Sequence, residues 1–369
     1  MFVTTKKYKF MVIGVLKEWA TKKVGLVPSV IKKLVKKGYI VHIETRAGRT
    51  SYFGNADFEK AGAIIKKRDE IFKTADILIS YTPIKKEECD KLQKGTTYIS
   101  LFKPYIYKDV PKRLKEYGII AFSLDMIPRS SIAQSMDVLS SMSSIAGYKA
   151  VLRAADLLPR YFPMLITAAG TIKPAKVLVV GAGVAGLQAI ATAKRIGAIV
   201  EAVDTRLETE DEVKSLGGKF LKVEGANQAT DQGYGAAQSE EYIKKQRQMM
   251  FDHITKADVI ICTATVRSTK APVIVTTEMV ENMRRGSVII DLAAESGGNC
   301  ELTENNKTVI HNYVTIVGDS NLSDAAVVDA STLFANNVYN FLEYISDENL
   351  KIQLDRDDEI IKASCIAKP

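Results

Sequence analysis

The chain has 369 residues, enough for two or three domains with proper hydrophobic cores. Its content of 46% hydrophobic and 25% charged residues is ordinary for a soluble globular protein. The formal net charge of +8 raises the question of a nucleic-acid or membrane-surface partner. Lysine pairs such as Lys32-Lys33, Lys36-Lys37 and Lys66-Lys67 sit at helical spacing beside apolar residues, so we interpret them as solvated helix faces. We expect no nucleic-acid partner, whereas docking of an acidic partner or an anionic bilayer by these lysines stays open.

Cysteine and histidine are sparse and unpatterned. The four cysteines and three histidines show no metal-ligand or disulfide spacing, so we expect no metal and a reduced cytoplasmic setting. No apolar run approaches the roughly 18 residues that a membrane helix needs. Residues 10–16 are too short for a signal peptide and lead straight into Lys17-Glu18, so they predict the first strand. Any role at a membrane is expected to come from a partner chain.

The first unit alternates strands and helices, which favours an α/β fold with a parallel sheet. Its strands are expected over Phe10–Leu16, Tyr39–Glu44, Asp76–Ser80, Thr97–Leu101 and Ile119–Ser123. The lysine-rich helix separates the first two of these strands.

A polar segment, residues 128–141, follows the last of these strands. A helix beginning near Ser131 and running to about Leu158 would carry a polar strip on one face, formed by Gln134, Asp137, Ser140 and Ser141. Arg129 could form a bidentate pair with Asp137 that orients both groups, and such residues at a domain junction suit a dinucleotide site. A capped helix with a solvated polar face explains the same residues equally well.

The second unit opens with a nucleotide-binding pattern. The β-branched run Val177–Val180 predicts a central strand buried on both faces of a parallel sheet. Three glycines follow at G-x-G-x-x-G spacing, namely Gly181, Gly183 and Gly186. The first permits a tight turn, the second lets backbone approach a pyrophosphate, and the third lets helix and strand pack closely. The phosphates would rest on the N-terminus of the next helix, which favours an anion.

An acidic residue completes this pattern. A helix over Leu187–Gly197 and a strand over Ile199–Val203 lead to Asp204, which lies 18 residues after Gly186 (204 − 186). This spacing is near the roughly 20 expected for a carboxylate that binds the ribose 2′-OH. The carboxylate would repel a 2′-phosphate, so we expect NAD(H), although Arg206 could accommodate that phosphate. The glycines alone are a weak signal, but their strand-helix-strand setting predicts nucleotide binding.

The rest of the chain completes the second unit and returns to the first. Further strands are expected over Lys219–Val223, Val259–Thr263, Val288–Ala293 and Val314–Gly318. Residues 224–240 lack apolar periodicity, and a loop of this length is either a mobile flap over the cofactor or an idle surface loop. The last helix, Thr332–Ile345, is expected to pack on the first domain.

These patterns predict an α/β protein of two Rossmann-like domains, with parallel twisted sheets joined by long helices. We expect residues 1–137 and 325–369 to form the first domain, and residues 138–324 to form the NAD(H)-binding domain.

Four stretches resemble the NAD(H)-binding domain I of proton-translocating nicotinamide nucleotide transhydrogenase, alpha subunit. They read PRSSIAQSMDVLSSMSSIAGYKAV, MLITAAGTIKPAKVLVVGAGVAGLQAIATAKRIGA, VDTRLETEDEVKSLGGKFL and GSVIIDLAAESGGNCELTE, within a likeness that begins near residue 8 and reaches the C-terminal tail. The resemblance implies direct hydride transfer between NAD(H) on this chain and NADP(H) on a partner subunit, coupled to proton movement across a membrane. It also implies a homodimer of this domain, separate membrane-spanning and NADP(H)-binding chains, and a place at the inner face of the plasma membrane.

The resemblance assigns roles to matching positions. The residues that would align the nicotinamide ring of NAD(H) are Arg129, Ser130, Asp137 and Ser140. Gln134 would reach towards the NADP(H) held by the partner subunit. Those that would contact the pyrophosphate and adenosine ribose are Gly181, Gly183, Val184, Asp204, Thr205 and Arg206. Gly233 and Tyr234 would close over NAD(H), and Thr265 would line the nucleotide. Because hydride passes directly between two nicotinamide rings, Arg129, Gln134, Asp137 and Ser140 would position reactants rather than carry protons.

The chain departs from the family pattern in three places. Ile132 and Lys23 stand where arginine is usual, and residues 264–272 read ATVRSTKAP in place of ALIPGKPAP. These changes bear on the geometry of the polar segment and on the docking surface.

Two alternatives stay open. Alanine dehydrogenase has the same two-domain plan but uses a lysine and a histidine, and the matching segments 79–83 and 100–104 contain no histidine. The other alternative is a non-catalytic NAD(H)-sensing module.

Overall fold

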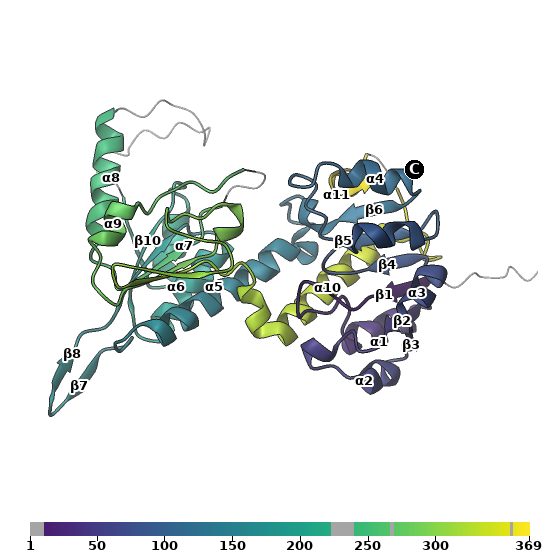
Figure 1. Ribbon diagram of the computed structural model, residues 1–369, viewed down its shortest axis with the longest axis horizontal. Helices are drawn as coiled ribbons and strands as arrows, with labels where there is room; N and C mark the ends of the chain where they lie inside the picture. Colours follow the sequence, from purple (N-terminus) through teal and green to yellow (C-terminus); the bar gives the residue numbers. More distant parts are fainter. Residues whose placement is uncertain (1–10, 223–239, 266–268, 355–356) are drawn as a thin grey trace, which may run out of the picture. The chain divides into compact units, whose positions relative to one another are not determined.

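The computed structural model describes residues 11–222, 240–265, 269–354 and 357–369. The chain divides into two compact units, here called unit 1 (Met1–Met142 with Ala326–Pro369) and unit 2 (Ser143–Ala325). In Figure 1 the first described elements, in purple, and the last ones, in yellow, both belong to unit 1. The long helix α5 (Val138–Leu157) runs through the boundary between the two ranges.

Unit 1 is built on a seven-stranded sheet in the order β16-β6-β5-β4-β1-β2-β3. Its strands are β1 (Val12–Val15), β2 (Ile40–Glu44), β3 (Ile64–Lys66), β4 (Ile77–Ile79), β5 (Thr97–Ser100), β6 (Ile120–Ser123) and β16 (Cys365–Ala367). All neighbours are parallel except β16, which runs antiparallel to β6. Strand β1 lies between β2 and β4, so the strand order reverses there, and in open α/β sheets ligands bind at such a point.

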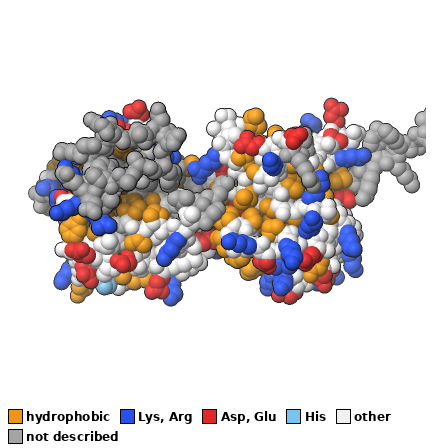
Figure 2. Space-filling model, turned by 90° about the horizontal axis from the view of Figure 1, so that it is seen from above, with side chains coloured by type: hydrophobic (Ala, Val, Ile, Leu, Met, Phe, Trp, Pro, Cys, Tyr) orange, Lys and Arg blue, Asp and Glu red, His pale blue; other side chains and the backbone are white. Residues whose placement is uncertain are grey.

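The helices of unit 1 bury apolar faces and expose lysines. They are α1 (Pro28–Lys36), α2 (Asn55–Lys60), α3 (Arg68–Thr74), α4 (Val110–Glu116), α10 (Val327–Ile345) and α11 (Glu359–Ser364). In α1 the residues Val30, Ile31 and Leu34 are buried whereas Lys32, Lys33 and Lys36 are exposed, which confirms the solvated helix face. On the face shown in Figure 2, basic side chains stand among acidic and apolar ones rather than in one continuous patch.

One lysine pair was predicted wrongly. Lys66 ends strand β3, and Lys67 is the residue before α3, so the pair does not lie on a helix face. The run Ile64–Lys66 is too short for its apolar pattern to distinguish strand from helix.

Helix α10 supplies much of the core of unit 1. Its residues Phe334 and Phe341 are fully buried, and their rings pack edge to face on Tyr81 and Phe122 respectively. The helix begins at Val327, five residues before the predicted start at Thr332. The start was missed because Val327 and Val328 precede a polar turn of the helix, Asp329 to Thr332, that interrupts the apolar pattern.

Unit 2 contains a second seven-stranded sheet, in the order β11-β10-β9-β12-β13-β15-β14. Its strands are β9 (Lys176–Val180), β10 (Ile199–Val203), β11 (Lys219–Phe220), β12 (Val259–Cys262), β13 (Val288–Asp291), β14 (Thr308–His311) and β15 (Val314–Val317). Only β14 is antiparallel to its neighbour. Its helices are α6 (Val184–Arg195), α7 (Thr209–Ser215), α8 (Glu240–Ile254) and α9 (Thr277–Glu281), with most of α5.

The central strand β9 is covered on both faces, as its apolar run predicted. Val177 and Val179 belong to a buried cluster with Ile190 of α6, whereas Leu178 and Val180 belong to another with Ile254 of α8. Successive side chains of a strand point to opposite faces, so a continuous apolar run fits a sheet with helices on both sides. The two parallel-dominated sheets confirm the predicted fold class.

Several elements differ from the prediction. A hairpin of β7 (Leu165–Thr167) and β8 (Gly170–Ile172) projects away from the rest of unit 2 in Figure 1. Strands β3, β14 and β16 were not predicted, and β11 ends at Phe220 rather than reaching Val223. These strands are two to four residues long, below the window in which a period-2 pattern is readable.

Candidate nucleotide-binding site

The three glycines of unit 2 form a tight turn between β9 and α6. Gly181 has a left-handed φ of +96°, which a side chain rarely adopts. A Cβ at Gly186 would come within 1.8 Å of the Gly181 carbonyl oxygen, so α6 and the end of β9 are too close at this position for any side chain. A Cβ at Gly183 would meet nothing within 4 Å, so this side of the turn is open. Each glycine thus has the local environment that its position in the motif requires.

The first turn of α6 has free backbone N–H groups beside the open side of Gly183. Gly183 is the N-cap residue, and no side chain caps the helix among the residues that the structure describes. Val184, the first residue of the helix, is 42% exposed. Uncapped N–H groups and the helix dipole together make an anion-binding position.

Asp204 lies at the carboxyl end of β10 and is tied to the glycine turn. Its Oδ2 accepts a hydrogen bond from the Ala182 backbone N–H at 2.7 Å, and its Oδ1 accepts one from the Arg206 N–H at 2.8 Å. The Arg206 guanidinium pairs with the same carboxylate through Nε and Nη2, each at 3.1 Å. Burial raises the pKa of Asp204, but these hydrogen bonds outweigh burial and bring the pKa below its ordinary value. The carboxylate is therefore an ionised acceptor.

Two buried residues, neither of them predicted as a site residue, hold the neighbouring loops. Asp291, fully buried at the end of β13, accepts the N–H groups of Asn299 at 2.7 Å and Cys300 at 2.9 Å. The buried Asn299 side chain in turn accepts the Ala264 N–H at 3.0 Å and donates to the Ala264 carbonyl at 2.8 Å. The segment DLAAESGGNC contained the signal, because an aspartate and an asparagine beside glycines are typical of side chains that hydrogen-bond to backbone.

The other predicted residues of unit 2 are placed as follows. Thr205 is exposed directly after Asp204, and Thr265 is exposed in the loop after β12. Because β12 and β10 are both neighbours of β9, these residues follow the three strands around the point where the strand order reverses. Gly233 and Tyr234 lie outside the described residues.

The polar segment of unit 1 is a turn and a short 3-10 helix rather than the start of α5. The 3-10 helix covers Gln134–Met136, and α5 begins at Val138, so the predicted helix start at Ser131 is wrong. The backbone bonds here are single 3-10 turns, such as Met136 N–H to the Ala133 carbonyl at 2.9 Å. Serine-rich segments compete with helix formation through such local bonds, which the 3.6-residue pattern could not reveal.

Seven residues of this segment nevertheless share one pocket, with a volume of about 270 Å³. They are Pro128, Arg129, Ser130, Ser131, Gln134, Asp137 and Ser140. The predicted residues Arg129, Gln134, Asp137 and Ser140 are thus brought together, although Ser141 does not line the pocket.

Asp137 and Ser140 are joined at the start of α5. The Ser140 N–H donates to Asp137 Oδ1 at 2.9 Å, and the Ser140 hydroxyl donates to Oδ2 at 2.6 Å. The suggested ion pair between Arg129 and Asp137 is not formed in the described portion of the chain, where Ser140 donates to both carboxylate oxygens of Asp137. Arg129 and Gln134 are exposed.

Helix α10 fixes the position of this pocket within unit 1. The side-chain amides of Asn337 and Asn340 both donate to the Ser135 carbonyl, at 2.8 Å and 3.0 Å. Ser135 lies between the pocket residues Gln134 and Asp137, so a helix about 200 residues away in sequence anchors the segment. Sequence reasoning missed these two asparagines, because nothing in their local pattern indicates the partner.

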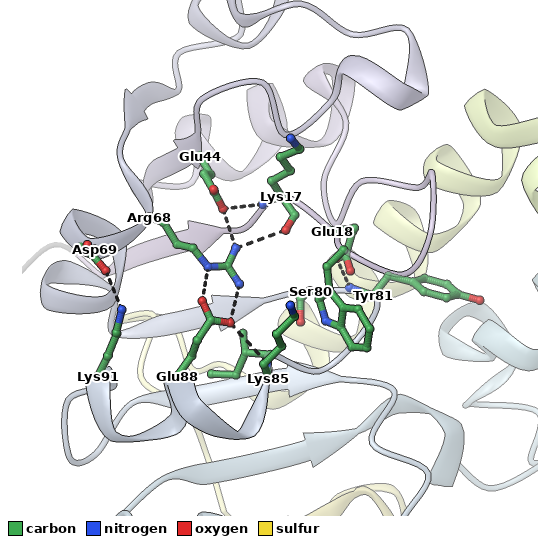
Figure 3. A network of polar contacts seen from close by, with 12 residues as sticks. Lys17, Glu18, Glu44, Arg68, Asp69, Ser80, Tyr81, Lys85, Glu88 and Lys91 are labelled. Carbon is green, nitrogen blue, oxygen red and sulfur yellow. Dashed lines mark hydrogen bonds and ion pairs between the residues drawn. The ribbon is translucent and has the colours of Figure 1, made fainter.

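A second polar group lies at the ends of β1 and β4 in unit 1, shown in Figure 3. Glu18 accepts the backbone N–H groups of Tyr81 at 2.6 Å and Thr82 at 2.9 Å. Burial raises the pKa of Glu18 to about 7, although these backbone bonds lower it. Beside them, Lys23 is 2% exposed and its Nζ lies 4.6 Å from the centre of the Tyr81 ring. Lys23, one of the predicted departures from the family pattern, therefore lies in the interior of unit 1.

No cluster of three or more metal-ligating side chains occurs among the described residues. Cys262 and Cys300 are buried, and burial raises the pKa of both thiols, to about 11 for Cys300. Within the described ranges, no helix combines the length and the apolar character needed to cross a bilayer.

Comparison with known proteins places these features in a family. The model of the N-terminal domain of alanine dehydrogenase/PNT matches residues 14–146, and that of the C-terminal domain matches residues 150–369. The chain is 41% identical over 356 residues to the first portion of the divided NAD(P) transhydrogenase subunit alpha of Rhodospirillum rubrum, covering 94% of this chain and 93% of that one. Among solved structures, the transhydrogenase of Sinorhizobium meliloti superposes with a TM-score of 0.88 at 37% identity, covering 97% of this chain and 98% of that one. An L-alanine dehydrogenase superposes with a TM-score of 0.79 at 25% identity, covering 96% of each chain. The chain therefore belongs to the alanine dehydrogenase/PNT family, and within it to the alpha subunits of NAD(P) transhydrogenase.

Proposed function

We propose that this chain binds NAD(H) as a subunit of a proton-translocating transhydrogenase and exchanges hydride directly with NADP(H) held by a partner subunit. The observation that carries the proposal is the composition of the pocket in unit 1. It gathers Arg129, Gln134, Asp137 and Ser140, and among the described residues no histidine, cysteine or lysine lines it. Such a lining can orient a ring and its carboxamide but offers no nitrogen base near neutral pKa. Direct hydride transfer needs orientation and no proton carrier.

The adenosine and pyrophosphate half of the cofactor is assigned to unit 2. The open side of Gly183 and the uncapped N-terminus of α6 fit a pyrophosphate. The ionised Asp204 fits the ribose hydroxyls as an acceptor. NAD(H), when bound, supplies or receives the hydride at C4 of its nicotinamide. Val184, Thr205 and Thr265 would line this half, being exposed beside the turn or at neighbouring strand ends.

The nicotinamide half is assigned to the pocket of unit 1. Arg129 and Ser130 would contact the ring end, and Ser140, oriented by Asp137, would bond the carboxamide. The exposed amide of Gln134 would reach the nucleotide of the partner. Gly233 and Tyr234, which lie outside the described residues, stay in this proposal as residues that would bind NAD(H).

Partners are proposed from the family. The Rhodospirillum rubrum relative is by name only the first portion of its alpha subunit, which supports a split subunit whose remaining portions would be separate chains. We propose that these chains span the membrane and bind NADP(H), and that this chain acts as a homodimer at the inner face of the membrane.

One assay separates this proposal from its alternatives. The purified chain is mixed with its NADP(H)-binding partner, NADPH and the acetylpyridine analogue of NAD, and reduction of the analogue is followed by absorbance. Reduction that requires both proteins supports hydride exchange. Alanine-dependent reduction of NAD without the partner would support alanine dehydrogenase, which the 25% identical structure makes the second candidate. NADH binding with neither reaction would support a sensing module.

A further inference from the structure

The carboxylate of Asp204 has no vacant acceptor position in this structure. Each oxygen accepts two hydrogen bonds: Oδ1 from Arg206 N and Nε, and Oδ2 from Ala182 N and Arg206 Nη2. A carboxylate oxygen has two lone pairs, so both are saturated. A ribose hydroxyl can donate to Asp204 only when one of these donors leaves.

The two kinds of donor differ in how firmly they are held. The Ala182 N–H belongs to the glycine turn, and the backbone of Arg206 is fixed by Thr209, whose N–H and hydroxyl both donate to the Arg206 carbonyl. The Arg206 side chain is 49% exposed, whereas the Asp204 side chain is 8% exposed. The guanidinium is therefore the donor that can rotate away, and Asp204 stays anchored by two backbone bonds without it.

We infer that the Arg206 guanidinium, in place of the direct contact with pyrophosphate or ribose that the family resemblance implies, competes with the ribose of the dinucleotide for Asp204, so that it lowers NAD(H) affinity and sets the selectivity of the site. This inference rests on the proposed NAD(H) site in unit 2. Arg206 acts as an internal ligand that the ribose hydroxyls displace, and it returns when the nucleotide leaves. A subunit that must release its product in every cycle gains from such a competitor, because weaker ground-state binding speeds release.

The displaced guanidinium also bears on NADP(H). An exposed arginine beside Asp204 can meet a 2′-phosphate, which Asp204 alone would repel. The hydrogen bond to Asp204 is the largest cause that raises the pKa of Arg206, and the charges of Glu208 and Glu212 raise it further. An arginine side chain also stays protonated without such a partner, so the cation persists whether or not Asp204 holds it. Arg206 therefore reduces the preference for NAD(H) over NADP(H) in two ways. It weakens the binding of NAD(H), and it offers a cation to the 2′-phosphate of NADP(H).

The test is the Arg206→Gln variant, with binding of NADH and NADPH measured by nicotinamide fluorescence. We expect the Kd for NADH to fall about two- to five-fold, which is the range for removing one exposed ion pair. NADPH binding should weaken or stay unchanged. The matched control is Arg153→Gln, which removes an exposed ion pair with Asp156 in unit 2 and should leave both constants unaltered. Weaker or unchanged NADH binding by Arg206→Gln would overturn the inference.

Two further measurements show that the competition is for the ribose. The Arg206→Gln variant should also bind AMP more tightly than the wild type does. It should show no such gain in affinity for 2′,3′-dideoxy-AMP, which lacks both hydroxyls. The gain in NADH affinity should also vanish in an Asp204→Ala background, because the competitor acts only through that carboxylate. Equal gains in affinity for AMP and dideoxy-AMP would contradict the mechanism, and so would a gain in NADH affinity in the Asp204→Ala background. If the wild-type chain binds no NADH at all, the proposed function itself fails, which is a distinct outcome.

Discussion

At the scale of single residues, the candidate site is made of groups held by their neighbours. Asp137 fixes the Ser140 hydroxyl at 2.6 Å, and two backbone N–H groups hold Asp204. Gln134 is different, because it lines the same pocket as Asp137 and Ser140 but is exposed and ends in a neutral amide. This position supports the proposal that Gln134 contacts the nucleotide of a partner subunit rather than NAD(H).

The Gln134→Ala variant tests that role. We expect NADH affinity to stay within about two-fold of wild type while hydride exchange with the partner slows by about ten-fold, the value of one well-placed hydrogen bond. Fluorescence titration gives the affinity, and reduction of the acetylpyridine analogue gives the rate. Ser135→Ala is the matched control, because only the backbone carbonyl of Ser135 makes its contacts with α10. Equal losses of binding and rate would remove Gln134 from the proposed role.

At the scale of elements, loops at the carboxyl ends of β1 and β4 are joined by partly buried polar side chains. Besides Glu18, Arg68 of α3 binds Glu44 of β2 at 2.7 Å and Glu88 at 2.6 Å, as Figure 3 shows. The Lys17 N–H donates to the same Glu44 carboxylate at 2.8 Å. The loop after β1 is therefore held to three neighbouring elements through side chains.

Glu18 makes this junction sensitive to pH. Burial raises its pKa from an ordinary value of 4.5 to about 7, so the folded chain holds a proton there that the unfolded chain loses at lower pH. The stability due to the neutral form is complete below pH 4.5 and is lost as the pH rises through about 7. The loss should be about 1 to 3 kcal/mol, since one pKa unit corresponds to about 1.4 kcal/mol.

The Glu18→Gln variant removes this titration. Glutamine can accept one backbone hydrogen bond fewer than glutamate, so the variant should be less stable by a constant amount at every pH. Its free energy of unfolding should, however, fall less between pH 5 and pH 8 than that of the wild type. Urea unfolding followed by fluorescence of Trp19, the only tryptophan of the chain, reports on unit 1. Glu87→Gln, an exposed glutamate of the same unit, is the control. Parallel pH profiles for wild type and Glu18→Gln would contradict the assignment.

At the scale of the whole molecule, unit 1 is completed by a segment that follows unit 2 in the sequence. Helix α10 packs its buried face into unit 1, and β16 pairs with β6 at the edge of the sheet. The same helix anchors Ser135 in the polar segment. Folding of unit 1 and placement of its pocket residues therefore depend on residues 327–367.

The Phe341→Ala variant tests this dependence. Phe341 is fully buried with its ring centre 5.3 Å from that of Phe122, so its truncation should cost unit 1 about 3–5 kcal/mol. Trp19 fluorescence during urea unfolding measures the change. Leu333→Ala is the control from the same helix, because Leu333 is 38% exposed and should cost well under half as much. Similar losses for both variants would show that α10 does not belong to the core of unit 1.

Some features of this protein were determined by the sequence alone, because their causes are local. The glycine spacing, the apolar run Val177–Val180 and the acid after β10 each depend on a short stretch of chain, and they predicted a parallel sheet with a nucleotide turn at its central strand. The lysines of α1 were assigned to a solvated face for the same reason: helical period and side-chain polarity are properties of nine consecutive residues.

Other features were decided only by tertiary structure. The partner of Asp137 is Ser140 rather than Arg129, the anchor of Ser135 is α10, and Asp291 and Asn299 hold the loop at Ala264. The edge strands β14 and β16 exist because a neighbouring strand offers them hydrogen bonds, not because of their own pattern. In each case the energy comes from a group distant in sequence, and a local pattern contains no information about which distant group folding will bring near.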